Sequence, residues 1–367
     1  MSIPKIVSIV GARPQFVKAA AVARSLDRWS DRLTSVLIHT GQHYDHWLSA
    51  VFFDELPLPR PHRYLGVGSG RHGAQTGEIL RRLELVLVEE EPDLVLVYGD
   101  TNSTLAGGLT ASKLQMPVAH VEAGLRCFRK EMPEEINRVV VDHISTLLFC
   151  PSPTAVANLR REGIQDASHV GDVMLDALNT FAPPLEMREG TLARHGLAAK
   201  SFGVATVHRA ENTDDRGRLG GIIRGLGLVA DAGIPVIAPL HPRTFQALQD
   251  IPVPRGVRFI DPVGYLEMLA LVAEAKLVLT DSGGVQREAF WLGVPCVLLR
   301  EETEWPETVS AGWNRLAGPD PARIVEAALE SPPTGSPTDV YGDGGASDRI
   351  VAEIAAFVGA AVPEVVG

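Results

Sequence analysis

Short apolar runs alternate with longer amphipathic segments along the chain, and this alternation constrains the fold more than any other feature. In the first half, runs rich in β-branched residues predict strands at 5–10, 33–39, 93–98, 117–121 and 146–150. The segments between them predict helices at 15–28, 75–90, 102–115, 134–145 and 152–163. Strands that are apolar throughout and separated by helices indicate a parallel sheet covered on both faces.

The same alternation restarts after a polar, proline-containing stretch near 183–201. It predicts strands at 202–207, 235–239, 256–260, 276–280 and 295–299, and helices at 216–231, 264–273, 284–291 and 319–330. Residues 331–346 are rich in Pro, Gly and Ser and predict a loop, and a last helix is expected at 347–361. We therefore expect an α/β protein with two doubly wound, Rossmann-like domains that face a cleft.

Charge and cysteine content exclude several classes of protein. With 34 Lys and Arg against 45 Asp and Glu the net charge is −11, which argues against a general nucleic-acid binder. Three cysteines without C-x-x-C spacing indicate neither a disulfide framework nor a zinc site, and they fit a reducing cytoplasm. The N-terminal sequence lacks the pattern of a signal peptide, and no apolar stretch reaches the length needed to span a bilayer.

Charged residues follow the predicted strands of the first half. Arg13 and Lys18 come after the first strand, Asp100 follows the strand at 93–98, and Glu122 follows the strand at 117–121. Glu134 opens the next helix. Carboxylates gathered at one sheet edge beside cations would suit proton transfer. Helix capping by Asp100 and favourable helix-dipole placement of Glu134 are the alternative explanations.

The second half contains an anion-binding pattern. Ser282, Gly283 and Gly284 stand between a strand and a helix, where backbone N–H groups can approach a phosphate. His208 and His241 also follow predicted strands, although histidines at such positions are often structural. The chain lacks the G-x-G-x-x-G and Walker A patterns, D-x-D spacing and H-E-x-x-H, so neither a nucleotide cofactor nor a metal is predicted.

Taken together, the motifs GARPQFVK, TGQHYD, VYGDTNST, HVEAGLR, MPEEINR, VHRAEN, HPRT, TDSGGVQREA and TEWPE resemble those of the non-hydrolysing UDP-N-acetylglucosamine 2-epimerases, over residues 4–318. The resemblance implies a glycosyltransferase-B-type fold and interconversion of UDP-N-acetylglucosamine and UDP-N-acetylmannosamine, without NAD or a metal. It also implies a homodimer, an N-terminal domain over 1–170, a UDP-binding domain over 171–346, and a C-terminal helix within 347–367 that packs back on the first domain.

The resemblance also implies roles for individual residues. Asp100, Glu122 and Glu134 match the family's catalytic carboxylates, supported by Lys18 and His208. The positions that match its UDP-binding residues are Arg13, His241, Ser282, Gly283, Gly284 and Glu288, and the segment from Pro262 to Tyr265 is expected to border the uracil.

Several positions depart from the family pattern. The segment between Glu122 and Pro133 is two residues shorter than in the best-known bacterial members, Trp305 replaces an arginine and Ala210 replaces a basic residue. Asp45 replaces a glutamine where regulated members bind an activating substrate molecule, so we expect no such activation. The alternatives are a 2-epimerase acting on UDP-N-acetylgalactosamine or a UDP-diacetamido-uronic acid, or a glycosyltransferase on the same fold.

Overall fold

The computed structural model describes residues 3–42, 55–56, 58–240, 242–248, 251–334, 336–337 and 339–360. Its contacts divide the chain into two units, each built around its own sheet. Unit 1 comprises the chain up to Thr180 together with the segment that begins at Asp339, and unit 2 runs from Phe181 to Thr338. Residues 171–180 and 339–346, which we assigned to the second domain, thus belong to unit 1.

Unit 1 contains a seven-stranded parallel sheet in the order β3-β2-β1-β4-β5-β6-β7. Its strands are β1 (Lys5–Val10), β2 (Thr34–His39), β3 (Arg63–Tyr64), β4 (Leu94–Tyr98), β5 (Val118–Val121), β6 (Leu147–Cys150) and β7 (Ser168–His169). Its helices are α1 (Arg13–Asp27), α3 (His72–Glu90), α4 (Asn102–Lys113), α5 (Pro133–Ile144), α6 (Pro153–Arg161), α7 (Val173–Phe181) and α16 (Ala346–Phe357), with the 3-10 turn η1 (Asp339–Tyr341).

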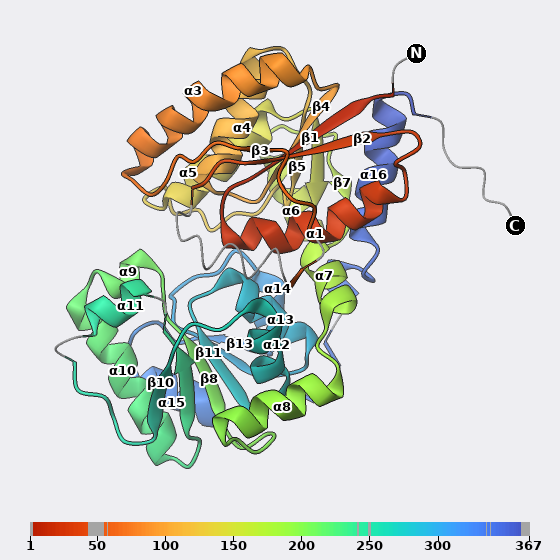
Figure 1. Ribbon diagram of the computed structural model, residues 1–367. Coiled ribbons are helices and arrows are strands. Elements are labelled where there is room, and N and C mark those ends of the chain that lie inside the picture. The colour runs from red at the N-terminus through yellow and green to blue at the C-terminus, as the bar shows by residue number, and fades with distance from the viewer. Residues whose placement is uncertain are drawn as a thin grey trace, which may run out of the picture. The chain divides into compact units, whose positions relative to one another are not determined.

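The helices of unit 1 cover both faces of its sheet, as Figure 1 shows. Helices α3, α4 and α5 pack in a row, and Ile79 and Leu83 of α3 belong to the same buried apolar cluster as Val7 and Val95 of the central strands. Helix α1 contacts β1, β2 and β4, and α16 packs against α1. Apolar runs without alternation thus form strands that are buried on both faces.

Unit 2 contains a six-stranded parallel sheet in the order β10-β9-β8-β11-β12-β13. Its strands are β8 (Gly203–Thr206), β9 (Val236–Pro239), β10 (Val257–Ile260), β11 (Leu277–Thr280), β12 (Cys296–Leu298) and β13 (Asn314–Leu316). Its helices are α8 (Leu185–His195), α9 (Ala210–Thr213), α10 (Arg216–Asp231), α11 (Pro242–Ala247), α12 (Tyr265–Glu274), α13 (Gly283–Trp291), α14 (Pro306–Ser310) and α15 (Pro321–Leu329). The expected pair of doubly wound domains is confirmed.

Sheet order places one switch point in each unit. In unit 1 the chain runs outward from β1 to β3 on one side and from β4 to β7 on the other, so the crevice lies between β1 and β4. In unit 2 the corresponding crevice lies between β8 and β11. Ligands of open α/β sheets bind beyond the carboxyl ends of the strands at such points. The residues that follow these four strands are therefore the first candidates for a functional site.

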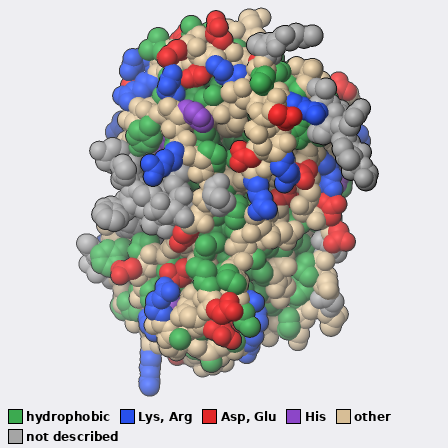
Figure 2. Space-filling model, turned by 45° about the vertical axis from the view of Figure 1, so that its right-hand side comes forward, with side chains coloured by type: hydrophobic (Ala, Val, Ile, Leu, Met, Phe, Trp, Pro, Cys, Tyr) green, Lys and Arg blue, Asp and Glu red, His purple; other side chains and the backbone are tan. Residues whose placement is uncertain are grey.

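The surface carries charged side chains of both signs. On the face that Figure 2 shows, the coloured Lys and Arg side chains are interspersed with Asp and Glu rather than gathered into one broad basic surface. Within the described residues, no helix has both the length and the apolar character needed to cross a membrane.

Each unit contains one buried cysteine that should lower its stability at alkaline pH. Burial raises the pKa of Cys150 in unit 1, where the charge of Asp142 adds to the effect, and burial raises that of Cys296 in unit 2. The pKa of each thiol is higher in the folded protein than in the unfolded chain, where it is about 8.5. The stability that each buried thiol contributes is therefore fully present below about pH 8.5 and decreases as the pH rises further.

We expect each cysteine to contribute a slope of about −1.4 kcal/mol per pH unit to the free energy of unfolding above that pH. Urea unfolding between about pH 8 and 10 measures the slope, and Cys150→Ala and Cys296→Ala should each reduce it by about this amount. Equal slopes in wild type and both variants would contradict the prediction.

Candidate active site

A buried glutamine, Gln15, connects the backbone at the carboxyl ends of β1 and β4. The side chain of Gln15 accepts hydrogen bonds from the backbone of Gly11 and Ala12 at 2.8 and 3.0 Å, and it donates to the Tyr98 carbonyl at 2.9 Å. Arg13 stands beside it as the first, partly exposed residue of α1. The sequence analysis did not single out Gln15, although a polar residue in the first turn of an apolar helix was a visible signal.

Asp100 is held by an arginine and does not cap α4. The N-cap of that helix is Thr101, whose side chain accepts from the Thr104 N–H. The Asp100 carboxylate instead forms an ion pair with Arg138 of α5, at 2.5 Å from Nη2. Its own backbone carbonyl accepts a hydrogen bond from Asn137 at 2.8 Å. The simple capping explanation of Asp100 is therefore wrong.

Glu122 forms a buried ion pair with Lys18. Its Oε1 lies 2.5 Å from Nζ of Lys18, and both side chains are more than nine-tenths buried. Glu122 also has a φ of 74°, in the left-handed region that non-glycine residues rarely adopt. Gly99 lies close to the pair, since a Cβ built on it would be 3.1 Å from Nζ and 3.5 Å from Oε1. The structure thus brings together Gly99 and two of the expected site residues.

The start of α5 carries two glutamates with different surroundings. Glu135 is buried, accepts hydrogen bonds from the backbone of Cys127 and Phe128 and lies 3.0 Å from Arg138. Glu134 is partly exposed, and its carboxylate makes no hydrogen bond or ion pair among the described residues. Of the two carboxylates, Glu134 is the one able to meet a ligand.

In unit 2, a fully buried carboxylate organises the exits of β8 and β11. Asp281 accepts hydrogen bonds from the backbone N–H groups of His208 and Arg209 at 3.1 and 3.0 Å and from the side chain of Asn212 at 3.1 Å. Its Oδ1 also lies 3.3 Å from Nδ1 of His208, a side chain that is largely exposed. Asp281 thus fixes the turn that presents His208.

The N-terminus of α13 has the form of an anion site. Ser282 is its N-cap and accepts from the Val285 N–H at 3.4 Å, while Gly283 and Gly284 form its first turn and are partly exposed. A Cβ on either glycine would meet only ordinary contacts, beginning at 3.6 Å for Gly283 and 3.8 Å for Gly284. Packing within the chain does not require glycine here, whereas the close approach of a ligand to the backbone would.

Three further residues of unit 2 that the sequence analysis named, Glu288, Tyr265 and Trp305, are buried. Glu288 is buried beside Tyr265, and burial together with the Glu288 charge raises the pKa of the Tyr265 phenol. Trp305 is also buried, and the Arg287 guanidinium lies 3.8 Å from the centre of its ring. His241 and Asp45 lie outside the described residues.

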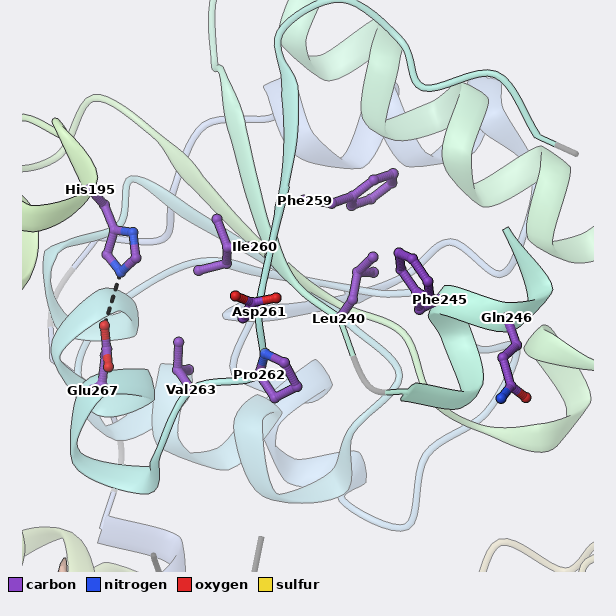
Figure 3. A pocket seen from close by; sticks show the side chains of 10 residues that line it. All are labelled: His195, Leu240, Phe245, Gln246, Phe259, Ile260, Asp261, Pro262, Val263 and Glu267. Atoms are coloured by element: carbon purple, nitrogen blue, oxygen red, sulfur yellow. Dashed lines mark hydrogen bonds and ion pairs between the residues drawn. The ribbon is translucent and has the colours of Figure 1, made fainter. Parts of the chain in front are cut away.

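A pocket of about 780 Å³ opens at the carboxyl ends of β9 and β10 (Figure 3). Pro262 and Val263, expected to border the uracil, line it together with Leu240, Phe245 and Phe259. At its other side Nε2 of His195 lies 2.9 Å from Oε1 of Glu267, a contact that the dashed line in Figure 3 marks. Within the described residues, no group of three or more His, Cys, Asp or Glu could hold a metal ion.

Known proteins resemble the chain over nearly its whole length. The sequence model of the UDP-N-acetylglucosamine 2-epimerase family matches residues 25–355. A UDP-N-acetylglucosamine 2-epimerase homolog of Methanococcus maripaludis is 48% identical, over 95% of this chain and 98% of the relative. The UDP-2,3-diacetamido-2,3-dideoxy-D-glucuronate 2-epimerase of Pseudomonas aeruginosa is 46% identical, over 96% and 99%.

A solved structure extends the likeness to the fold. The crystal structure of the Methanocaldococcus jannaschii UDP-GlcNAc 2-epimerase in complex with UDP-GlcNAc and UDP superposes with a TM-score of 0.88 and 41% identity, covering 96% of this chain and 99% of that one.

Proposed function

We propose a function from one premise: the chain belongs to the UDP-N-acetylglucosamine 2-epimerase family. It interconverts UDP-N-acetylglucosamine and UDP-N-acetylmannosamine without hydrolysing them. The observation that carries the proposal is the likeness to the M. jannaschii enzyme, whose structure was solved with UDP-GlcNAc and UDP. Because the three cysteines show no C-x-x-C spacing, we propose that the reaction takes place in the reducing cytoplasm, and we expect the enzyme to be a homodimer.

The chemistry of the substrate explains why acids and an anion site are both needed. Carbon 2 of the sugar has no neighbouring carbonyl, so direct removal of its proton would be slow. In the proposed reaction a carboxylate takes the C2 proton while the bond from C1 to the diphosphate oxygen breaks, giving 2-acetamidoglucal and UDP. UDP then adds back at C1 and C2 receives a proton on the opposite face, so atoms and charge balance.

Unit 1 supplies the proton-transfer groups in this proposal. Asp100, Glu122 and Glu134 are the carboxylates that exchange protons with the sugar. Lys18 holds Glu122 by the buried ion pair and balances its charge. Arg13, which follows β1, supplies a positive charge that stabilises the departing diphosphate.

Unit 2 binds the nucleotide. The backbone N–H groups at Ser282, Gly283 and Gly284 receive the diphosphate at the start of α13 and stabilise it as a leaving group. His241 contributes to UDP binding, His208 is a supporting catalytic group, and Glu288 accepts hydrogen bonds from the ribose. The pocket in Figure 3 borders the base through Pro262 and Val263.

A second substrate has specific support. The P. aeruginosa relative, named for a diacetamido-glucuronate, is 46% identical, whereas the M. jannaschii UDP-N-acetylglucosamine 2-epimerase is 43% identical over 88% of this chain. Sequence identity therefore does not decide whether the substrate of this chain is a neutral UDP-sugar or a UDP-uronic acid.

Incubation in deuterated water with a panel of UDP-sugars tests the reaction and its substrate together. We expect deuterium at C2 of UDP-N-acetylglucosamine and appearance of its 2-epimer. Deuterium exchange at C2 of the UDP-diacetamido-glucuronate alone would show that this sugar, and not UDP-N-acetylglucosamine, is the substrate. Free UDP with the sugar moved to an acceptor would indicate a glycosyltransferase, and UDP binding without exchange in any sugar would contradict an epimerase.

Gly99→Ala should damage the site more than a comparable substitution elsewhere. Gly99 and Gly196 have φ values of 62° and 60°, so alanine costs about 1–2 kcal/mol of backbone strain at either position. Only the Gly99 substitution also crowds the ion pair, since its Cβ would lie 3.1 Å from Nζ of Lys18, whereas nothing lies within 4 Å of a Cβ at Gly196.

We expect Gly99→Ala to lower kcat by about 100-fold, and Gly196→Ala to leave it nearly unchanged. Steady-state kinetics and thermal unfolding of the two variants provide the comparison. Similar kcat values for both would show that the contact with the ion pair has no effect on turnover.

A further inference from the structure

A histidine lies buried between the two strand exits that carry Asp100 and Glu122. His120 belongs to β5 and is fully buried. Its Nδ1 lies 2.7 Å from Oδ1 of Asp142 in α5, and its Nε2 lies 2.7 Å from the carbonyl oxygen of Gly99. One ring therefore connects α5, β5 and the exit of β4.

Both neighbours of the ring are hydrogen-bond acceptors. A carboxylate oxygen faces one nitrogen and a backbone carbonyl oxygen faces the other. A neutral imidazole has only one N–H, so one nitrogen would point its lone pair at an oxygen lone pair. A buried polar atom without a partner is costly, whereas an imidazolium satisfies both acceptors.

Charges around the ring are balanced. Asp142 also accepts from Nη1 of Arg126 at 2.7 Å, and Arg126 is paired with Glu162 at 2.6 Å. Although burial opposes ionisation of Asp142, the hydrogen bond and charge of His120, with those of Arg126, lower the pKa of that carboxyl. The Cys150 thiol, which senses the Asp142 charge, has a raised pKa and stays neutral. Arg126 thus faces two carboxylates, and an imidazolium at His120 would supply a second cation and balance them.

The bonds of this cluster fix the backbone on both sides of the candidate acids. The Gly99 carbonyl belongs to the peptide that leads into Asp100, and Glu122 follows His120 by two residues. Asp142 further accepts from the backbone of Gly124 at 3.2 Å, just beyond Glu122. A change at His120 would therefore move both strand exits.

We propose that His120 is held as an imidazolium by Asp142 and acts as a positioning residue, fixing Asp100 and Glu122 relative to each other for proton transfer. Only the kinetic part of the proposal rests on the proposed function. The protonation of the ring is a property of unit 1 alone and can be measured without substrate.

Nitrogen NMR of the ¹⁵N-histidine-labelled protein tests the protonation. At about pH 8, above the ordinary histidine pKa of about 6.5, we expect both ring nitrogens of His120 to carry protons. His62 is the internal reference, since its Nδ1 accepts from the Leu37 N–H and carries none. The His120 signals are assigned by their loss in His120→Gln, and Asp142→Asn should return the ring to one proton. A neutral His120 in the wild-type protein would overturn the proposal.

His120→Gln tests the positioning. Its amide can still donate to Gly99, but its carbonyl would face the Asp142 carboxylate. We expect kcat to fall by about 100-fold, while KM and the Kd for UDP stay within about threefold of the wild-type values. His143→Gln, on the exposed side of α5, is the matched control and should change none of these.

Each result has a defined meaning. A His120→Gln enzyme with kcat within about threefold of wild type would overturn the proposal. So would a parallel loss of UDP binding, which would show general damage. If His120→Gln does not fold, the His120 signals are assigned by their change in Asp142→Asn, and the NMR result then decides alone. If the wild type exchanges no deuterium with any UDP-sugar, the proposed function fails while the protonation result still stands.

Discussion

Glu122→Gln is expected to lower kcat for epimerisation by about 1,000-fold and the free energy of unfolding of unit 1 by about 3 kcal/mol. The first effect follows because an amide cannot exchange a proton with carbon 2. The second follows because Lys18 would keep a buried positive charge without a partner. The Kd for UDP should stay within about twofold, since the proposed nucleotide site belongs to unit 2.

The double variant Lys18→Met/Glu122→Gln separates the two effects. Removing both charges should restore most of the lost stability but none of the activity. Glu89→Gln, which breaks an exposed ion pair with Arg63, is the surface control and should change stability by less than about 1 kcal/mol. Deuterium exchange at C2 and urea unfolding give the two readouts. Turnover of Glu122→Gln within about threefold of wild type would remove Glu122 from the catalytic groups.

Asp281→Asn should produce the second large effect, in unit 2. The carboxylate accepts from three donors in the turn that presents His208, and an amide would turn N–H groups toward at least one of them. Hydrogen bonds to a charged group contribute about 1.5–3 kcal/mol each, so we expect a loss of about 3 kcal/mol. Weaker UDP binding, by about tenfold, should accompany it as His208 and Arg209 move.

Asp320→Asn is the matched control for that substitution. Asp320 is the exposed N-cap of α15 and accepts from two backbone N–H groups, a role that asparagine also fills well. Calorimetric titration with UDP and thermal unfolding should therefore show a change only for Asp281→Asn. Equal effects of the two substitutions would mean that the buried carboxylate does not organise the phosphate side of unit 2.

Sequence patterns predicted the central strands well because each is a continuous apolar run. The strands β3 and β7 were missed because two residues are too few to form a pattern. Strand β13 (NRL) was missed because it lacks the apolar run that marks the equally short β12 (CVL). Helix α8 was also missed and its segment was expected to be a polar connection. Only Thr191 and Leu192 are buried in it, so it shows almost no apolar face.

The candidate acids could be found from their positions after strands, but their partners could not. Asp142 lies 22 residues from His120, and Asp281 lies 73 from His208. No local pattern links residues so far apart, because their contact depends on which strands are neighbours in the sheet. The signals in the sequence were polar residues inside apolar runs, such as His120 within PVAHV.

The return of the chain to unit 1 has a consequence for synthesis. Asp348 of α16 accepts from Ser25 of α1 at 2.5 Å, Glu353 accepts from Ser168 at 2.7 Å, and Ile350 and Ile354 are fully buried. A ribosome makes α16 only after all of unit 2, at about 5–20 residues per second. Unit 1 is thus completed only after unit 2 has been made, and until α16 packs, the part of the α1 surface that it covers stays exposed.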